Sequence, residues 1–136
     1  MIVIDSSVWI ELFNDSDARE VEELVRLLRS EEVVAITGLI LTEVLRGCSS
    51  EQEARRVARE LVALPLLELS APEDHMEAAR LFRQARSAGV TVRKTTDLLI
   101  AATCIKFEAS LLHRDRDFDH LARVTDLKVW EPGAAT

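Results

Sequence analysis

The sequence is poor in cysteine and in aromatic residues, and it has no long apolar run. Cys48 and Cys104 lie far apart without metal-ligand spacing, which argues against a structural zinc site and against a secreted disulfide framework. With two tryptophans, four phenylalanines and no tyrosine, the chain has little material for a base-stacking platform. The longest apolar run, residues 98–102, is too short to cross a bilayer. We find no basic leader at the N-terminus and therefore expect a cytoplasmic protein with no membrane partner.

The length and composition are those of an ordinary globular domain. A chain of 136 residues, 48% hydrophobic and 30% charged, suits a single domain spanning residues 1–136. Its 17 basic and 24 acidic residues give a net charge of −7. Such a surface does not attract nucleic acid as a whole, so any contact with RNA must depend on a local site.

Short apolar runs alternate with segments of helical periodicity. We expect strands at residues 2–4, 33–36, 66–69, 110–113 and, at a sheet edge, 128–130. We expect helices at residues 6–13, 17–29, 38–46, 51–63, 72–89 with Pro72 in the first turn, 97–107 with Thr96 as the N-cap, and 118–123. The residues from Pro132 onward are expected to fray. This alternation predicts a parallel sheet covered on both faces, with a ligand crevice at the carboxyl ends of the strands.

Acidic side chains from four segments fall where this topology would bring them to one edge of the sheet. Asp5 ends the first strand, and Asp115 and Asp117 follow the fourth. Glu43 lies in the helix after the second strand, and Asp97 opens the apolar helix that leads into the fourth. The joint pattern, more than any one residue, favours a shared acidic site.

Each acid also has a purely structural explanation. Asp5 could cap the following helix, Asp97 could be stabilised by the dipole at the start of its helix, and Glu43 could pair with Arg46. The two aspartates after the fourth strand could lie in a solvated loop between arginines. If the acids do converge, however, two carboxylates about 4 Å apart repel by roughly 4 kcal/mol at an effective dielectric of about 20. A hard divalent cation with oxygen ligands, Mg²⁺ or Mn²⁺, would relieve that repulsion, and we interpret His113 as a core or strand-end residue.

The ordered set of motifs resembles the PIN-domain ribonucleases, in particular the VapC toxins of bacterial VapB–VapC toxin–antitoxin pairs. The matching stretches are residues 2–7, 41–45, 95–102 and 111–118. The resemblance implies a three-layer α/β/α sandwich around a mostly parallel five-stranded sheet. It also implies Mg²⁺- or Mn²⁺-dependent endoribonuclease activity, homodimerisation and inhibition by a cognate VapB-type antitoxin.

The resemblance also implies roles for single residues. The family's acidic quartet, which holds a metal-activated water for the hydrolysis of RNA phosphodiesters, falls on Asp5, Glu43, Asp97 and Asp115. Of these, Asp5, Asp97 and Asp115 match the metal ligands. Ser7 matches a hydroxyl that could hold a water on the metal, and Asp117 matches an extra acid of many of these toxins. The expected products carry 5′-phosphate and 3′-hydroxyl ends.

Basic and apolar residues near these segments leave two alternatives open. Four basic residues could contact RNA phosphates, or could merely balance nearby aspartates: Arg93, Lys94, Arg114 and Arg116. Trp9, Phe13 and the apolar helix from Leu98 could provide surface for a homodimer, or could form a plain core.

Three rival functions are weaker. A receiver-type phosphoacceptor needs an acidic pair after the first strand, where Ser6 and Ser7 follow Asp5, and an aspartate at the end of the third strand, where Ser70 stands. A phosphatase of the haloacid dehalogenase type needs an aspartate at the position of Ser7. A binding module of the same fold with little catalysis is the remaining alternative, and the intact quartet argues against it.

Overall fold

Five short parallel strands form one sheet in the computed structural model, which describes residues 1–134. The strands are β1 (Ile2–Ile4), β2 (Val34–Thr37), β3 (Leu66–Leu67), β4 (Ser110–Leu112) and β5 (Lys128–Val129). Their order is β3-β2-β1-β4-β5, and each neighbouring pair is parallel. This confirms the predicted sheet and the edge position of the last strand.

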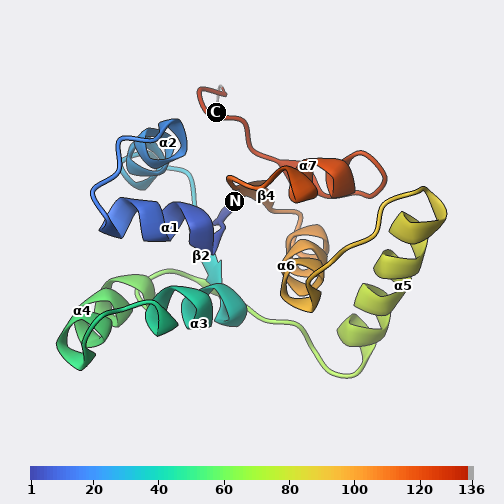
Figure 1. The fold of residues 1–136 in the computed structure, drawn as a ribbon, viewed down its shortest axis with the longest axis horizontal. Helices are drawn as coiled ribbons and strands as arrows, with labels where there is room; N and C mark the ends of the chain where they lie inside the picture. The colour runs from blue at the N-terminus through green and yellow to red at the C-terminus, as the bar shows by residue number, and fades with distance from the viewer. Residues whose placement is uncertain (135–136) are drawn as a thin grey trace.

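Helices cover both faces of the sheet. They are α1 (Ser6–Phe13), α2 (Arg19–Leu28), α3 (Gly38–Arg46), α4 (Glu51–Leu61), α5 (Glu73–Ser87), α6 (Thr95–Lys106) and α7 (Arg116–Ala122). Figure 1 shows α1–α4 on one side of the strands and α5–α7 on the other. The chain builds the sheet first toward β3 and then back toward β5, so right-handed crossovers place the two sets of helices on opposite faces. The α/β/α class is confirmed. Within residues 1–134, no helix is long and apolar enough to span a membrane.

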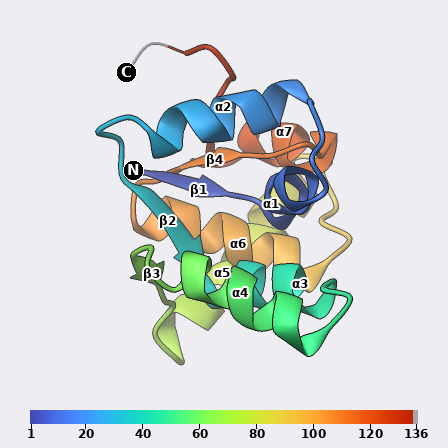
Figure 2. The same cartoon turned by 90° about the vertical axis from the view of Figure 1, so that its left-hand side faces the viewer.

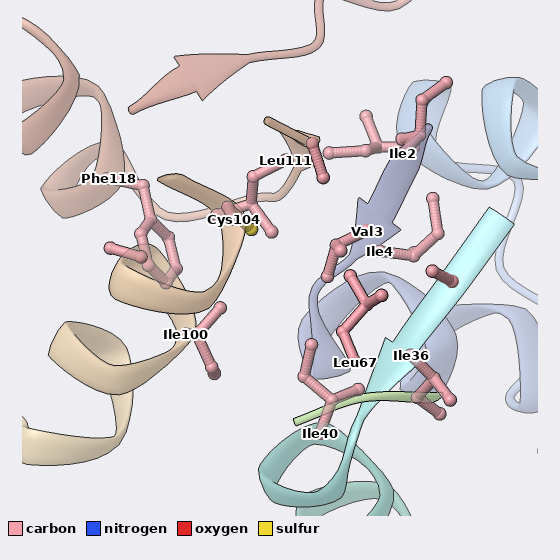
Figure 3. Packing of buried hydrophobic residues seen from close by; sticks show 14 of the residues in the cluster. Ile2, Val3, Ile4, Ile36, Ile40, Leu67, Ile100, Cys104, Leu111 and Phe118 are labelled. Carbon is pink, nitrogen blue, oxygen red and sulfur yellow. The ribbon is translucent and has the colours of Figure 1, made fainter. Parts of the chain in front are cut away.

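The core lies on both faces of the central strands. All three residues of β1 are buried, as expected for the middle strand of a covered parallel sheet. In Figure 3, Ile100 of α6 and Phe118 of α7 lie to the left of β1 and β2, and Ile40 of α3 lies below these strands. Trp9 is 3% exposed and stacks on Phe13 with ring centroids 6.3 Å apart, and six residues of α6 are buried. Trp9 and α6 therefore contribute to the core. Of the two alternatives for these residues, a homodimer surface or a plain core, the structure shows the core.

Pairing and capping move two element boundaries from their predicted positions. β3 ends at Leu67, not at residue 69, because its partner β2 ends at Thr37, which pairs with Leu67. α7 begins two residues earlier than predicted, because the carboxylate of Asp115 caps it by accepting from the backbone N–H of Asp117. The predicted bounds of β1, α1 and α3 match the observed ones, and the predicted ends of the remaining helices and strands differ from the observed ones by at most two residues.

Two capping predictions were wrong. The N-cap of α6 is Lys94, whose backbone is extended (φ −116°, ψ 127°) and whose side chain makes no capping bond. The predicted cap, Thr96, therefore lies inside the first turn. Pro72 is the N-cap residue of α5, one position before the helix begins at Glu73, and is not in its first turn.

The C-terminal segment is held against α2. The carbonyl of Pro132 accepts from Arg19 at 3.1 Å, and the backbone N–H of Gly133 donates to Glu23 at 3.0 Å. Residues 132–134 are therefore anchored, and the prediction that they fray was wrong. The last two residues of that prediction, 135–136, lie outside the described part of the chain.

Candidate active site at the carboxyl end of the sheet

Asp5 lies between β1 and α1, two elements that Figure 2 shows following one another. Its Oδ2 accepts from the Ser7 backbone N–H at 3.3 Å and from the Ser7 hydroxyl at 2.6 Å. Its own N–H donates to the carbonyl of Leu112 at 2.9 Å, which ties it to the end of β4. Asp5 is thus a helix cap, as its structural explanation required, yet it is 6% exposed and stands at the predicted edge of the sheet.

Glu43 lies on α3, which packs against α1 on the same side of the sheet. It is half-buried in α3, and its Oε1 accepts a hydrogen bond of 3.2 Å from the hydroxyl of Ser6. Ser6 is the first residue of α1, so the bond joins two helices that pack against each other. Among the described residues, the ion pairs do not include the alternative pairing of Glu43 with Arg46.

Burial and the charges of the three other acids raise the pKa of Asp97. Asp97 lies in the first turn of α6. Burial is the largest cause that raises its pKa to about 6, and the negative charges of Asp5, Asp115 and Glu43 raise it further, while the positive charge of Lys94 acts in the opposite direction. The fold therefore brings Asp5, Glu43 and Asp115 within electrostatic reach of Asp97.

The turn between β4 and α7 carries the remaining acids. Asp115 is the N-cap of α7, and its Oδ1 accepts from the backbone N–H of Asp117 at 2.9 Å. Asp117 and Asp97 line the same small cavity, about 30 Å³ in volume, together with Arg93. Asp117 thus lies beside the acidic site and not in an isolated solvated loop.

The predicted basic residues differ in their surroundings. Arg114 bridges α1 and α2, because its guanidinium lies 3.2 Å from Oε1 of Glu11 and 3.0 Å from Oε1 of Glu20. The charge-balancing alternative therefore describes Arg114, although its partners are glutamates of other helices and not the neighbouring aspartates. Lys94 and Arg93 lie next to Asp97, which leaves them as candidates for phosphate contact.

The fourth basic residue, Arg116, is the first residue of α7 and is exposed. The ion pairs of the described chain do not include it. It also stays a candidate for phosphate contact.

The donor chemistry of the site fits a hard divalent cation. Its polar groups are carboxylate and hydroxyl oxygens, which such an ion prefers as ligands, and the negative charges of the other acids add to burial in raising the pKa of Asp97. Within residues 1–134, no three His, Cys, Asp or Glu side chains are already gathered as one metal shell. This does not conflict with Mg²⁺, because that ion is commonly held by one or two carboxylates, with waters and substrate phosphates as its other ligands.

Two neighbours of the acids were missed as functional residues. Ser6 and Ser7 both match the family's small hydroxyl residue, with the water assigned to Ser7, and the contact of Ser6 with Glu43 spans 37 positions of the chain, so no local signal reveals it. His113 was predicted to be a core or strand-end residue, and its side chain is 5% exposed. The sequence does not show that the ring of His113 accepts a hydrogen bond from the backbone N–H of Asp115.

The fold and the acidic edge define a known class. The model of the PIN domain family matches residues 2–124, and this chain belongs to that family. Among its relatives, Ribonuclease VapC11 of Mycobacterium tuberculosis is 39% identical over 129 residues, which cover 94% of this chain and 96% of the relative. Ribonuclease VapC51 of the same species is 33% identical over 123 residues, or 90% of this chain and 86% of the relative.

Solved structures share the same fold. The chain matches a structure of VapBC2 from Rickettsia felis, bound to a DNA fragment from their promoter, with a TM-score of 0.75 and 20% identity. That match covers 96% of this chain and 100% of the other. A structure of VapBC-1 from nontypeable Haemophilus influenzae matches with a TM-score of 0.71 and 18% identity over 96% of this chain and 98% of the other.

Proposed function

We propose that this chain is an endoribonuclease of the VapC type that hydrolyses RNA phosphodiesters and serves as the toxin of a toxin–antitoxin pair. The observation that carries the proposal is that the negative charges of Asp5, Glu43 and Asp115 all act on Asp97 and raise its pKa. The 39% identity to Ribonuclease VapC11 over 94% of the chain supports it independently. A binding module would not need four carboxylates at one edge, since their repulsion disfavours the folded state.

The proposal includes a divalent ion, Mg²⁺ or Mn²⁺, with Asp5 and Asp97 as its principal protein ligands and Asp115 as a ligand either directly or through a water. When bound, the ion would neutralise phosphate charge and make water a better nucleophile. The pKa of Asp97 would fall toward its ordinary value when a bound cation offsets the neighbouring negative charges. Glu43, held by Ser6, is placed to orient water or a second ion, and Ser7 is held on Asp5 at 2.6 Å.

The proposal also names macromolecular partners. The substrate is RNA, contacted through its phosphates by Arg93, Lys94 and Arg116. The inhibitor is a VapB-type antitoxin, supported by the VapBC assemblies among the structures that share this fold. We further propose a homodimer in the cytoplasm. Sedimentation of the purified chain at micromolar concentration tests the dimer, and a sole species of 15.3 kDa would exclude it.

The decisive experiment maps the 5′ and 3′ ends of RNA cleaved by the purified protein. We expect cleavage with Mg²⁺ or Mn²⁺, loss of cleavage in EDTA, and products with 5′-phosphate and 3′-hydroxyl ends. Asp5→Asn and Asp97→Asn are the matched controls, since each removes one negative charge with almost no change in shape. Equal cleavage by the wild type and both variants would assign the activity to a contaminating nuclease. Products ending in 2′,3′-cyclic phosphate would exclude the proposed chemistry.

A further inference from the structure

His113 is a buried residue whose two ring nitrogens both have partners. Its Nδ1 accepts a hydrogen bond of 2.9 Å from the backbone N–H of Asp115, two residues further along the chain. Its Nε2 lies 3.0 Å from Oδ1 of Asp119, in the first turn of α7. The ring also packs against Phe118, with ring centroids 5.2 Å apart.

These contacts define the tautomer of the ring. Nδ1 can accept from a backbone N–H only through its lone pair, so the ring proton is on Nε2. Nε2 therefore donates to Asp119, whose ionised carboxylate only accepts. Rotation of the ring away from this position would break both hydrogen bonds at once.

The bond to Asp115 continues into the active site. With its N–H held by His113, Asp115 in turn accepts from the N–H of Asp117 through Oδ1 at 2.9 Å. Two successive side-chain-to-backbone bonds, each from residue i to residue i+2, thus shape the turn from β4 into α7. Such bonds favour one turn conformation over the alternatives open to a short loop.

We propose that His113 is a positioning residue, which orients the carboxylate of Asp115 through the main chain of the turn. This inference rests on the proposed function, because it assigns His113 a task for one acid of that site. His113 does not touch the substrate in this role. It supplies a fixed acceptor, and Asp119 holds the ring in place by accepting the hydrogen bond from Nε2–H on the far side of the ring.

The role of the acceptor can be separated from that of the ring. His113→Asn keeps an acceptor, because its Oδ1 occupies the position of Nδ1 relative to Cβ, but it loses the ring and the bond to Asp119. His113→Leu keeps an apolar side chain of similar bulk and removes the acceptor. His120→Leu is the matched control, since His120 is an exposed histidine of the same helix as Asp119.

The variants are compared by kcat and KM for RNA cleavage, with circular dichroism to check their fold. We expect His113→Leu to lower kcat by about 10- to 100-fold with little change in KM, as for a displaced catalytic group. We expect His113→Asn to keep most of the wild-type kcat and His120→Leu to match the wild type. Wild-type kcat in His113→Leu, or an equal loss in the folded Asn and Leu variants, would overturn the inference.

Nuclear magnetic resonance supplies a readout that is independent of activity. In the wild type, the ¹⁵N spectrum must show Nδ1 of His113 without a proton, and the Asp115 amide must be protected from hydrogen exchange. Asp119→Ala should reduce that protection, because it releases the far side of the ring. A proton on Nδ1, or an unprotected Asp115 amide in the wild type, would overturn the inference even if His113→Leu did not fold.

The two proposals fail in different ways. If the wild type does not cleave RNA, or if Asp115→Asn cleaves as well as the wild type, the proposed function is wrong. The resonance measurements on His113 and Asp115 still decide whether the histidine sets the turn. Conversely, if cleavage depends on Asp115 but not on His113, the proposed nuclease function stands and the positioning role of His113 is wrong.

Discussion

The hydroxyl of Ser6 donates a hydrogen bond of 3.2 Å to Oε1 of Glu43, which joins the first residue of α1 to α3. Ser6 is 9% exposed, so the donor is largely shielded from water. A glutamate side chain has several rotamers, and holding one of them requires a partner. Ser6 thus restricts the position of an acid that belongs to the proposed active site.

Ser6→Ala should weaken cleavage without disrupting α1. Alanine favours a helix, and the cap of α1 comes from Asp5 and not from Ser6. We expect kcat to fall roughly tenfold and the free energy of unfolding to fall by about 1 kcal/mol, the usual contribution of one hydrogen bond. Thr42→Ala is the matched control, since it removes an exposed hydroxyl of α3 that bonds the Gly38 carbonyl. Equal kcat in the two variants would separate Ser6 from the chemistry.

Asp97→Asn should stabilise the metal-free protein at neutral pH. The pKa of Asp97 is raised to about 6 in the folded state, above its ordinary value of 3.8. Between these values the folded state binds more protons than the unfolded state, so stability falls as the pH rises through this window. The loss of stability caused by ionised Asp97 is complete above pH 6. We therefore expect Asp97→Asn to raise the free energy of unfolding by about 1–2 kcal/mol at pH 7.

Urea unfolding in EDTA at pH 7 and pH 4 measures this effect, with the exposed Asp17→Asn as the control. The gap between Asp97→Asn and the wild type should narrow at pH 4, where the wild-type carboxyl is largely protonated. Added Mg²⁺ should then raise the stability of the wild type more than that of the variant, since binding to the folded state shifts the equilibrium. A gap that does not change with pH would contradict the assigned cause.

Glu23→Gln should loosen the C-terminal segment. Glu23 is 4% exposed and accepts from Arg26 at 2.6 and 3.0 Å, from the Trp130 indole at 2.8 Å and from the Gly133 N–H at 3.0 Å. The hydrogen bond from Arg26 is the largest cause that lowers the pKa of Glu23 to about 2. Its stabilising contribution is therefore complete above pH 4.5 and is lost as the pH falls toward 2.

We expect Glu23→Gln to lower the free energy of unfolding at pH 7 by about 2 kcal/mol, within the range for hydrogen bonds to a charged group. The difference from the wild type should shrink at pH 3. Glu22→Gln is the control, because Glu22 is the exposed neighbour on the same helix. If both variants lose the same stability, the network around Glu23 does not anchor the segment.

The salt dependence of RNA binding should distinguish the basic residues. In the Asp97→Asn background, which blocks cleavage, alanine at Arg93, Lys94 or Arg116 should flatten the slope of log affinity against log salt by about 0.7–1. Arg114→Ala should leave the slope unchanged and lower stability, because this arginine is engaged by glutamates of α1 and α2. A flattened slope for Arg114→Ala would show that RNA displaces those ion pairs.

Some structural details could not have been read from local patterns. The pairing of β3 with the end of β2 shortened a predicted strand, and the extended backbone at Lys94 moved a helix start. Arg114 looked like a partner for its neighbouring aspartates and proved to bridge two other helices. In each case the deciding partner lies far away in the sequence or is a main-chain conformation that no side chain specifies.

Periodicity and the chemistry of single residues were enough to predict the alternation of strands and helices, the parallel sheet and the acids at its carboxyl end, because these depend on local hydrophobic patterning and on a general rule of topology. The tertiary structure alone decided how strongly the acids act on Asp97, which hydroxyl holds Glu43, how His113 bonds the turn at Asp115, and what anchors residues 132–134. Burial and electrostatic coupling depend on distances between residues that only the packed chain brings together.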